Sequence, residues 1–300
     1  MRLDEISKRM NHRDFQGSLV AVFHEKLREL QMKCDLVDAY RKNDYSSVAH
    51  LDNGLYGAIN PFLVEESVGK IFGHGGSTDR AEMLGSILSK HRIEELLREN
   101  IDRIGLKGVV IEWGDSGLSR IAVSHGRYPK IRISEQAIIR EREFLSIFAH
   151  EVETHLVRSI RGEETGLLLF KHGTGFSLGD EEGLAVWKSL QALPPDCRKD
   201  AMYEQYFLVS QAQHRSFSQL ADTIRSLRSD RSLSYVFNLC LRLKRGIERT
   251  SIRGEGVLYG KNKIYLDGYR RVADWISQGN DPDRLLIGKI KISDLQFITE

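Results

Sequence analysis

The chain has 300 residues, which is enough for one large domain or for a catalytic domain with an accessory lobe. Its 44 Lys and Arg residues nearly balance 42 Asp and Glu residues, so the charge predicts neither nucleic acid nor an anionic membrane as a partner. The three cysteines, Cys34, Cys197 and Cys240, lack CxxC spacing, which argues against a disulfide framework and an all-cysteine zinc site.

The N-terminus has no uninterrupted apolar core of the kind found in secretory signals. No stretch approaches the ~18 apolar residues of a membrane span. We therefore expect a soluble, cytoplasmic protein. The sequence predicts no particular oligomeric state.

Apolar residues at helical spacing predict a helix over residues 17–43. Asn-Gly and Asn-Pro pairs then predict a loop over 44–63. The glycines of 73–77 predict a flexible boundary. It would separate an N-terminal helical accessory segment, 1–76, from a catalytic domain, 77–300.

A helix capped by Ser77 or Thr78 is expected to run through Leu97. Three short β-branched runs with Gly or Pro between them predict a small antiparallel sheet from 109–113, 120–123 and 130–133. A helix over 134–160 and a glycine-rich loop over 162–179 are expected to follow.

Further helices are expected over 180–192, 198–228 and 232–248, with short breaks. A glycine-broken segment, 253–260, leads to a short predicted strand at 264–266. The predicted class is α+β, mostly helical, with a small antiparallel sheet and an N-terminal helical extension.

A motif with metal-binding character, His150-Glu151-Val152-Glu153-Thr154-His155, follows the apolar run 144–149. Polar groups of these types in such a helix need a partner or a metal. Zinc peptidases commonly use two histidines of one helix, a glutamate between them as general base, and a third ligand further along the chain. The motif therefore predicts a zinc-dependent peptidase.

The spacing of the two histidines requires an irregular helix. His150 and His155 are five residues apart, which places them about 140° apart around a regular α-helix. A π-bulge, with its i→i+5 bonding, would bring them to one face, so we predict a bulge between them. In the alternative interpretation, Glu151 and His155 form a helix-surface pair and His150 is a core histidine.

Three adjacent carboxylates, Asp180, Glu181 and Glu182, begin the next predicted helix. Asp180 would suit an N-cap, and the two glutamates would suit the positive end of the helix dipole. Alternatively, one of the glutamates is the third metal ligand. The physics of the sequence alone does not choose between Glu181 and Glu182.

His-Glu-x-x-x-His followed by Glu-Gly-Leu-Ala resembles the microtubule-associated tyrosine carboxypeptidase family, which includes the flavohemoglobin expression-modulating QEGLA-motif proteins of bacteria. The resemblance covers about residues 80 to 275. It implies that His150, His155 and Glu182 bind zinc and that Glu151 is the catalytic base. Glu182 is chosen because it directly precedes Gly-Leu-Ala.

The resemblance also implies a peptide or protein C-terminus as substrate. A cation must then hold the terminal carboxylate. Lys261 is the candidate, with Arg158 and Arg253 as alternatives, and Tyr265 would line the pocket or stabilise the oxyanion. Lys261 could instead be a solvated loop charge and Tyr265 a strand aromatic.

The sequence departs from the family pattern at three positions. Gly260 and Asn262 stand where the family usually has threonine and aspartate, and Glu153 stands at a common glycine position. The first two departures bear on substrate preference.

Two other functions remain open. One is a zinc aminopeptidase or endopeptidase with the same ligands. The other is a non-catalytic regulatory module, whose structural zinc would have a closed coordination shell. His172, between the two motifs, is an alternative ligand.

Overall fold

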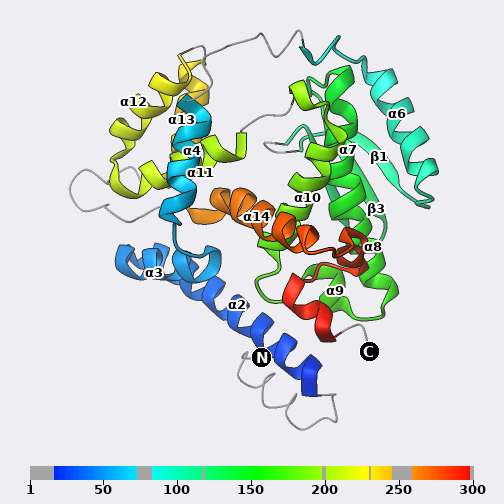
Figure 1. Ribbon diagram of the computed structural model, residues 1–300, viewed down its shortest axis with the longest axis horizontal. Coiled ribbons are helices and arrows are strands. Elements are labelled where there is room, and N and C mark those ends of the chain that lie inside the picture. Colours follow the sequence, from blue (N-terminus) through cyan, green and yellow to red (C-terminus); the bar gives the residue numbers. More distant parts are fainter. Residues whose placement is uncertain are drawn as a thin grey trace. The chain divides into compact units, whose positions relative to one another are not determined.

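The computed structural model describes residues 17–72, 83–116, 119–197, 201–229, 231–244 and 259–297 (Figure 1). The chain forms two compact units that interleave in sequence. The first unit is Met1–Gly75 with Lys199–Asp267, and the second is Gly76–Arg198 with Gly268–Glu300. The predicted boundary at 73–77 lies outside the described residues, and the assignment of catalysis to 77–300 stays a prediction.

The described residues of the first unit form helices. These are α2 (Gly17–Lys42), α3 (Tyr45–Tyr56), α4 (Pro61–Phe72), α11 (Ala201–His214), α12 (Phe217–Leu227), α13 (Leu233–Lys244) and η4 (Gly260–Lys263). The prediction of a loop over 44–63 was wrong. Asp44 caps α3 by accepting a hydrogen bond from the Ser47 amide, and Pro61 occupies the first position of α4, where its missing N–H costs nothing.

A three-stranded sheet belongs to the second unit. It consists of β1 (Val110–Gly114), β2 (Ile121–His125) and β3 (Pro129–Ser134), in the order β1-β3-β2. The three predicted strands are confirmed, but the purely antiparallel arrangement was wrong, since β1 pairs with β3 in parallel. Ile131 and Ile133 of β3 are fully buried, which suits the central strand. The spacers predicted turns, but they carry no information on which strand lies in the middle.

Helices pack against this sheet to form the core of the second unit. The helices are α6 (Lys90–Arg103), α7 (Phe144–His150), η2 (Glu151–Leu156) and α8 (Val157–Glu164). Buried residues of α6, α7 and η2 join those of the sheet in one apolar cluster, and Ile160 of α8 packs against it. The cluster includes Ile93, Leu97, Ile131, Ile133, Phe144, Phe148, Val152 and Leu156. The same α7–η2 stretch also contacts α10.

The remaining elements of the second unit are α9 (Leu168–His172), α10 (Leu178–Ala192), η3 (Pro195–Cys197), η5 (Pro282–Ile287), η6 (Ile292–Phe297) and the greater part of α14 (Ile264–Ser277). The predicted strand at 264–266 was wrong because these residues form the first turn of α14. A short apolar run does not distinguish strand from buried helix. The predicted loop over 162–179 contains α9 in its middle.

Helix starts also differ from the predictions. Ser89 caps α6, and the predicted caps Ser77 and Thr78 lie outside the described residues. The helix predicted from 134 begins at Phe144, after a short 3-10 turn, Glu141–Glu143. No helix within the described ranges combines the length and the apolar character needed to cross a membrane.

Helices α10 and α14 cross at glycines. A Cβ atom on Gly183 would overlap the backbone of Gly268, and one on Gly268 would overlap the carbonyl group of Gly179. Because these neighbours are backbone atoms, no side-chain rotation relieves the overlap. Gly183 of the Glu-Gly-Leu-Ala motif thus permits the crossing, while Leu184 and Ala185 fill the core.

We expect Gly268→Ala to lower the free energy of unfolding by about 1–3 kcal/mol, the typical cost of overpacking. The matched control is Gly69→Ala in α4, where an added Cβ meets nothing within 4 Å. Alanine is the better helix former, so the control should be neutral or slightly stabilising. Urea unfolding midpoints measure the stability of both variants. Equal midpoints for Gly268→Ala and Gly69→Ala would contradict the close crossing of α10 and α14.

Candidate metal centre

The helix between the two histidines is widened, as predicted. Residues Glu151–Leu156 form a π-helix, in which the Val157 amide donates to the Val152 carbonyl in an i→i+5 bond. The Thr154 side chain is fully buried, and its hydroxyl donates to the Ala149 carbonyl at 2.8 Å. The hydroxyl thus supplies a hydrogen-bond donor to a backbone carbonyl of the widened turn.

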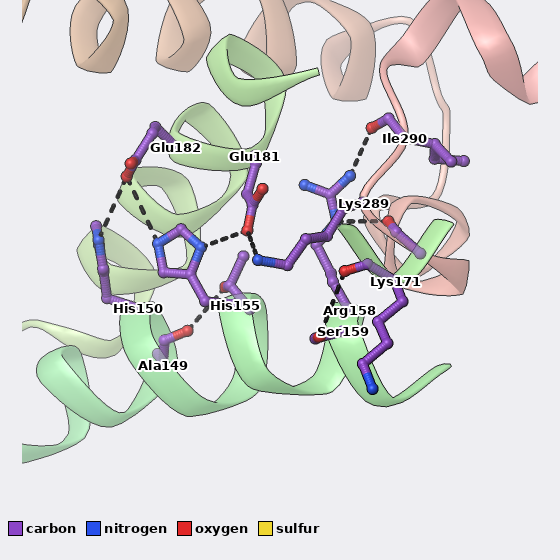
Figure 2. Close-up of polar contacts among 12 residues, drawn as sticks. Ala149, His150, His155, Arg158, Ser159, Lys171, Glu181, Glu182, Lys289 and Ile290 are labelled. Atoms are coloured by element: carbon purple, nitrogen blue, oxygen red, sulfur yellow. Dashed lines mark hydrogen bonds and ion pairs between the residues drawn. The ribbon is translucent and has the colours of Figure 1, made fainter. Parts of the chain in front are cut away.

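The wide turn brings His150 and His155 together, with their ring centroids 5.1 Å apart. Glu182 of α10 faces both rings (Figure 2). Its Oε2 atom lies 3.8 Å from His150 Nε2 and 3.5 Å from His155 Nε2. The ligand atoms of the three residues all lie within 4.8 Å of one another. These residues therefore form a cluster that could hold a metal ion.

The two distances from Glu182 to the histidines are close to those between the ligands of a tetrahedral metal ion. Tetrahedral zinc with bonds of about 2.0–2.2 Å places its ligand atoms roughly 3.3–3.6 Å apart. Of the glutamate-to-histidine distances, 3.5 Å lies within this range and 3.8 Å lies slightly above it. Two imidazoles and one carboxylate are also a donor set of catalytic zinc sites.

Glu181 contacts the opposite side of the His155 ring. Its Oε1 atom lies 2.7 Å from His155 Nδ1 and 2.8 Å from Lys289 Nζ (Figure 2). A carboxylate on the second ring nitrogen fixes the orientation of a metal-binding histidine. The two adjacent glutamates thus have different contacts, with Glu182 facing Nε2 and Glu181 bound to Nδ1.

Sequence reasoning missed this contact of Glu181 and missed Lys289 entirely. The three adjacent carboxylates were the only signal for Glu181. Lys289 carried no signal, because it lies more than a hundred residues from either motif. The alternative in which Glu151 and His155 form a surface pair does not fit, since the His155 side chain is only 14% exposed and contacts both glutamates of α10.

Asp180 does not cap α10, which begins after Ser177. The Asp180 carboxylate is buried and accepts hydrogen bonds from Arg271 Nε at 2.8 Å and from the Ile292 amide at 2.9 Å. It therefore joins α10 to α14 and to the C-terminal residues of the second unit.

Burial and neighbouring charges shift the pKa values of the two histidines in opposite directions. Burial lowers the pKa of His150 to about 4, so this imidazole is neutral and has a free lone pair. Burial alone would lower the pKa of His155, but Glu181 and Glu182 raise it to about 10. Burial raises the pKa of Glu182, but His155 outweighs this effect and holds it below its ordinary value.

Glu151 has a carboxyl group suited to proton transfer. Burial raises its pKa to about 7, and the charges of Glu182 and Glu181 add to the rise, while His155 and Lys289 oppose it. A pKa near neutrality allows a group both to accept and to release a proton. Glu151 is thus the candidate general base of this centre.

Other predicted residues lie apart from the cluster. Arg158 is fully buried and donates to the carbonyls of Gly288 at 2.7 Å and Ile290 at 2.5 Å, so the suggestion that it binds a substrate carboxylate was wrong. His172 is exposed at the end of α9 and does not belong to the cluster. Glu153 forms an ion pair with Arg103 at 2.9 Å.

The proposed substrate residues lie in the first unit. Lys261 lies in η4 and Tyr265 in the first turn of α14, both half-buried. Tyr265 is therefore a helix residue and not a strand aromatic. Their contacts with substrate stay predictions, and Arg253 lies outside the described residues.

Comparison with known proteins identifies the family of the chain. A family model described as microtubule-associated tyrosine carboxypeptidase matches residues 2–300, which extends well beyond the two motifs. A search of curated proteins returned no match. The family indicates carboxypeptidase-type activity, and the cluster of His150, His155 and Glu182 lies within the matched residues. The chain therefore belongs to the microtubule-associated tyrosine carboxypeptidase family.

Proposed function

We propose that this protein is a zinc carboxypeptidase in which His150, His155 and Glu182 bind the metal and Glu151 is the general base. The observation that carries the proposal is the convergence of these three ligands, achieved through a π-helical turn. Membership of a carboxypeptidase family supports the reaction class. Three protein ligands are also the number found in catalytic zinc sites, whereas structural sites have four.

The residues of the chain perform the proton transfers and the positioning. A bound zinc ion supplies Lewis acidity toward the scissile carbonyl and makes water more acidic. Glu151 accepts a proton from the attacking water and passes it to the leaving amine. In the protein without bound metal, burial raises the pKa of Glu151 to about 7. Glu181 orients His155 through the 2.7 Å contact with Nδ1.

The proposed substrate is the C-terminus of a peptide or protein. The name of the family points to a terminal tyrosine as the residue removed. Lys261 remains the proposed partner of the terminal carboxylate, and Tyr265 is the proposed pocket residue. A cytoplasmic location is part of the same proposal.

Digestion of a peptide panel tests the reaction. Peptides ending in Tyr, Phe, Glu or Lys are supplied with either a free or an amidated C-terminus. We expect release of one C-terminal residue from the free forms only. A chelator should abolish this release and added zinc should restore it. Release of the N-terminal residue, or internal cleavage, would replace the proposal with an aminopeptidase or an endopeptidase. Zinc binding without any cleavage would favour the regulatory module.

A further inference from the structure

The residues 288–292, here called the C-terminal segment, lie beside the candidate metal site of His150, His155 and Glu182 in the second unit. Five hydrogen bonds hold the segment through its main chain. They are Arg158 Nε to Gly288 O (2.7 Å), a second Arg158 nitrogen to Ile290 O (2.5 Å), the Lys289 amide to Phe170 O (2.7 Å), the Thr174 amide to Lys289 O (2.9 Å) and the Ile292 amide to Asp180 Oδ2 (2.9 Å). Because these bonds use no side chain of the segment, its side chains can change while its path is retained.

This fixed segment directs the Lys289 side chain toward the candidate metal site. Lys289 Nζ lies 2.8 Å from Glu181 Oε1, and the same oxygen lies 2.7 Å from His155 Nδ1 (Figure 2). The Glu181 side chain is only 7% exposed and that of Lys289 is 23% exposed. The contacts therefore form a continuous series from an anchored ammonium group, through a buried carboxylate, to a candidate metal ligand.

The charges show why the ammonium group matters. The carboxylates Glu151, Glu181 and Glu182 gather around His150 and His155, and burying several like charges is costly unless cations offset them. Nearby Asp180 already has a cationic partner in Arg271. Arg158 also lies near Glu181, but its bonds to the C-terminal segment fix its position. The Lys289 ammonium group, by contrast, is in direct contact with the Glu181 carboxylate.

We propose that Lys289 is a positioning residue of the metal centre. Its ammonium group holds the Glu181 carboxylate in the orientation that accepts the Nδ1 proton of His155, which directs His155 Nε2 toward the metal. This inference rests on the proposed function, since it assumes a metal between His150, His155 and Glu182. Lys289 touches neither substrate nor metal and acts only through Glu181.

The primary test is the zinc affinity of full-length Lys289→Met, which keeps side-chain length and removes the charge. We expect zinc affinity to fall by roughly 10–100-fold, the usual effect of losing a residue that supports a ligand. Competition with a chromophoric chelator measures the affinity. The visible absorption spectrum of the cobalt-substituted protein should also shift, because it reports ligand geometry. A purely structural role would change the melting temperature without changing this spectrum.

Two further variants serve as controls. Lys291→Met removes a lysine from the same segment, one that lies 3.7 Å from Asp294, and should keep both zinc affinity and cobalt spectrum. Lys289→Arg retains the charge and should recover most of the affinity. Lys289→Gln is a second neutral variant, expected to show the same loss if Lys289→Met does not fold.

A double-mutant cycle then asks whether Lys289 acts through Glu181. Glu181→Gln should weaken zinc binding, and adding Lys289→Met to it should cause little further loss, because the contact is already removed. Additive losses would overturn the inference, as would wild-type affinity and spectrum in both neutral variants. Absence of zinc binding in the wild-type protein would instead overturn the proposed function together with the inference.

Discussion

Glu151→Gln is expected to lower kcat for peptide hydrolysis by about 10²–10⁴-fold, the range typical for loss of a general base, while zinc binding is retained. Glutamine keeps the size of the side chain, but its amide cannot accept a proton from water at neutral pH. The metal should remain because Glu151 is not one of the three converging ligands. The variant therefore separates proton transfer from metal binding.

The measurements are kcat on the best peptide of the panel and zinc content per chain. Glu153→Gln is the matched control, since it makes the same chemical change in the same π-helical turn at a side chain paired with Arg103. This control should retain wild-type kcat. Full activity in Glu151→Gln would remove Glu151 from the mechanism.

His155→Ala is expected to abolish zinc binding and, with it, hydrolysis. The change removes a proposed ligand, so its effect on affinity should exceed the roughly 10–100-fold caused by losing a supporting residue. It also leaves Glu181 and Glu182, both buried, without the imidazole that contacts each of them. Like charges left in a buried site repel one another, which should also lower the stability of the metal-free protein.

Zinc titration of the folded variant measures this effect, with circular dichroism as a check on folding. His172→Ala is the matched control, because His172 is an exposed histidine between the two motifs. It should bind zinc like the wild type. Retention of zinc in His155→Ala, or its loss in His172→Ala, would show that the ligand set is wrongly assigned.

The distortion of the metal-site helix could be predicted from the sequence because the geometry allowed few alternatives. Histidines five residues apart cannot face one ion from a regular helix. The structure confirms the wide turn at Glu151–Leu156. The physics of the sequence did not separate Glu181 from Glu182, since adjacent glutamates at a helix start look alike until their three-dimensional partners are known.

Other features depended on contacts between distant parts of the chain. The central position of β3 arises from packing of Ile131 and Ile133, which a pattern of short strands does not reveal. The run 264–266 has strand-like residues, yet it begins a helix whose next residues include Gly268 at the α10 crossing. Lys289 is placed by main-chain bonds to residues more than a hundred positions away.

Anomalous diffraction at the zinc absorption edge, from crystals of the purified full-length protein, tests the central claim most directly. We predict one zinc ion per chain, about 2.0–2.2 Å from His150 Nε2, His155 Nε2 and a carboxylate oxygen of Glu182, with no fourth protein ligand. A zinc ion enclosed by four protein ligands would contradict a catalytic centre. A zinc ion bound elsewhere, or no zinc in protein prepared with the metal, would contradict the ligand assignment itself.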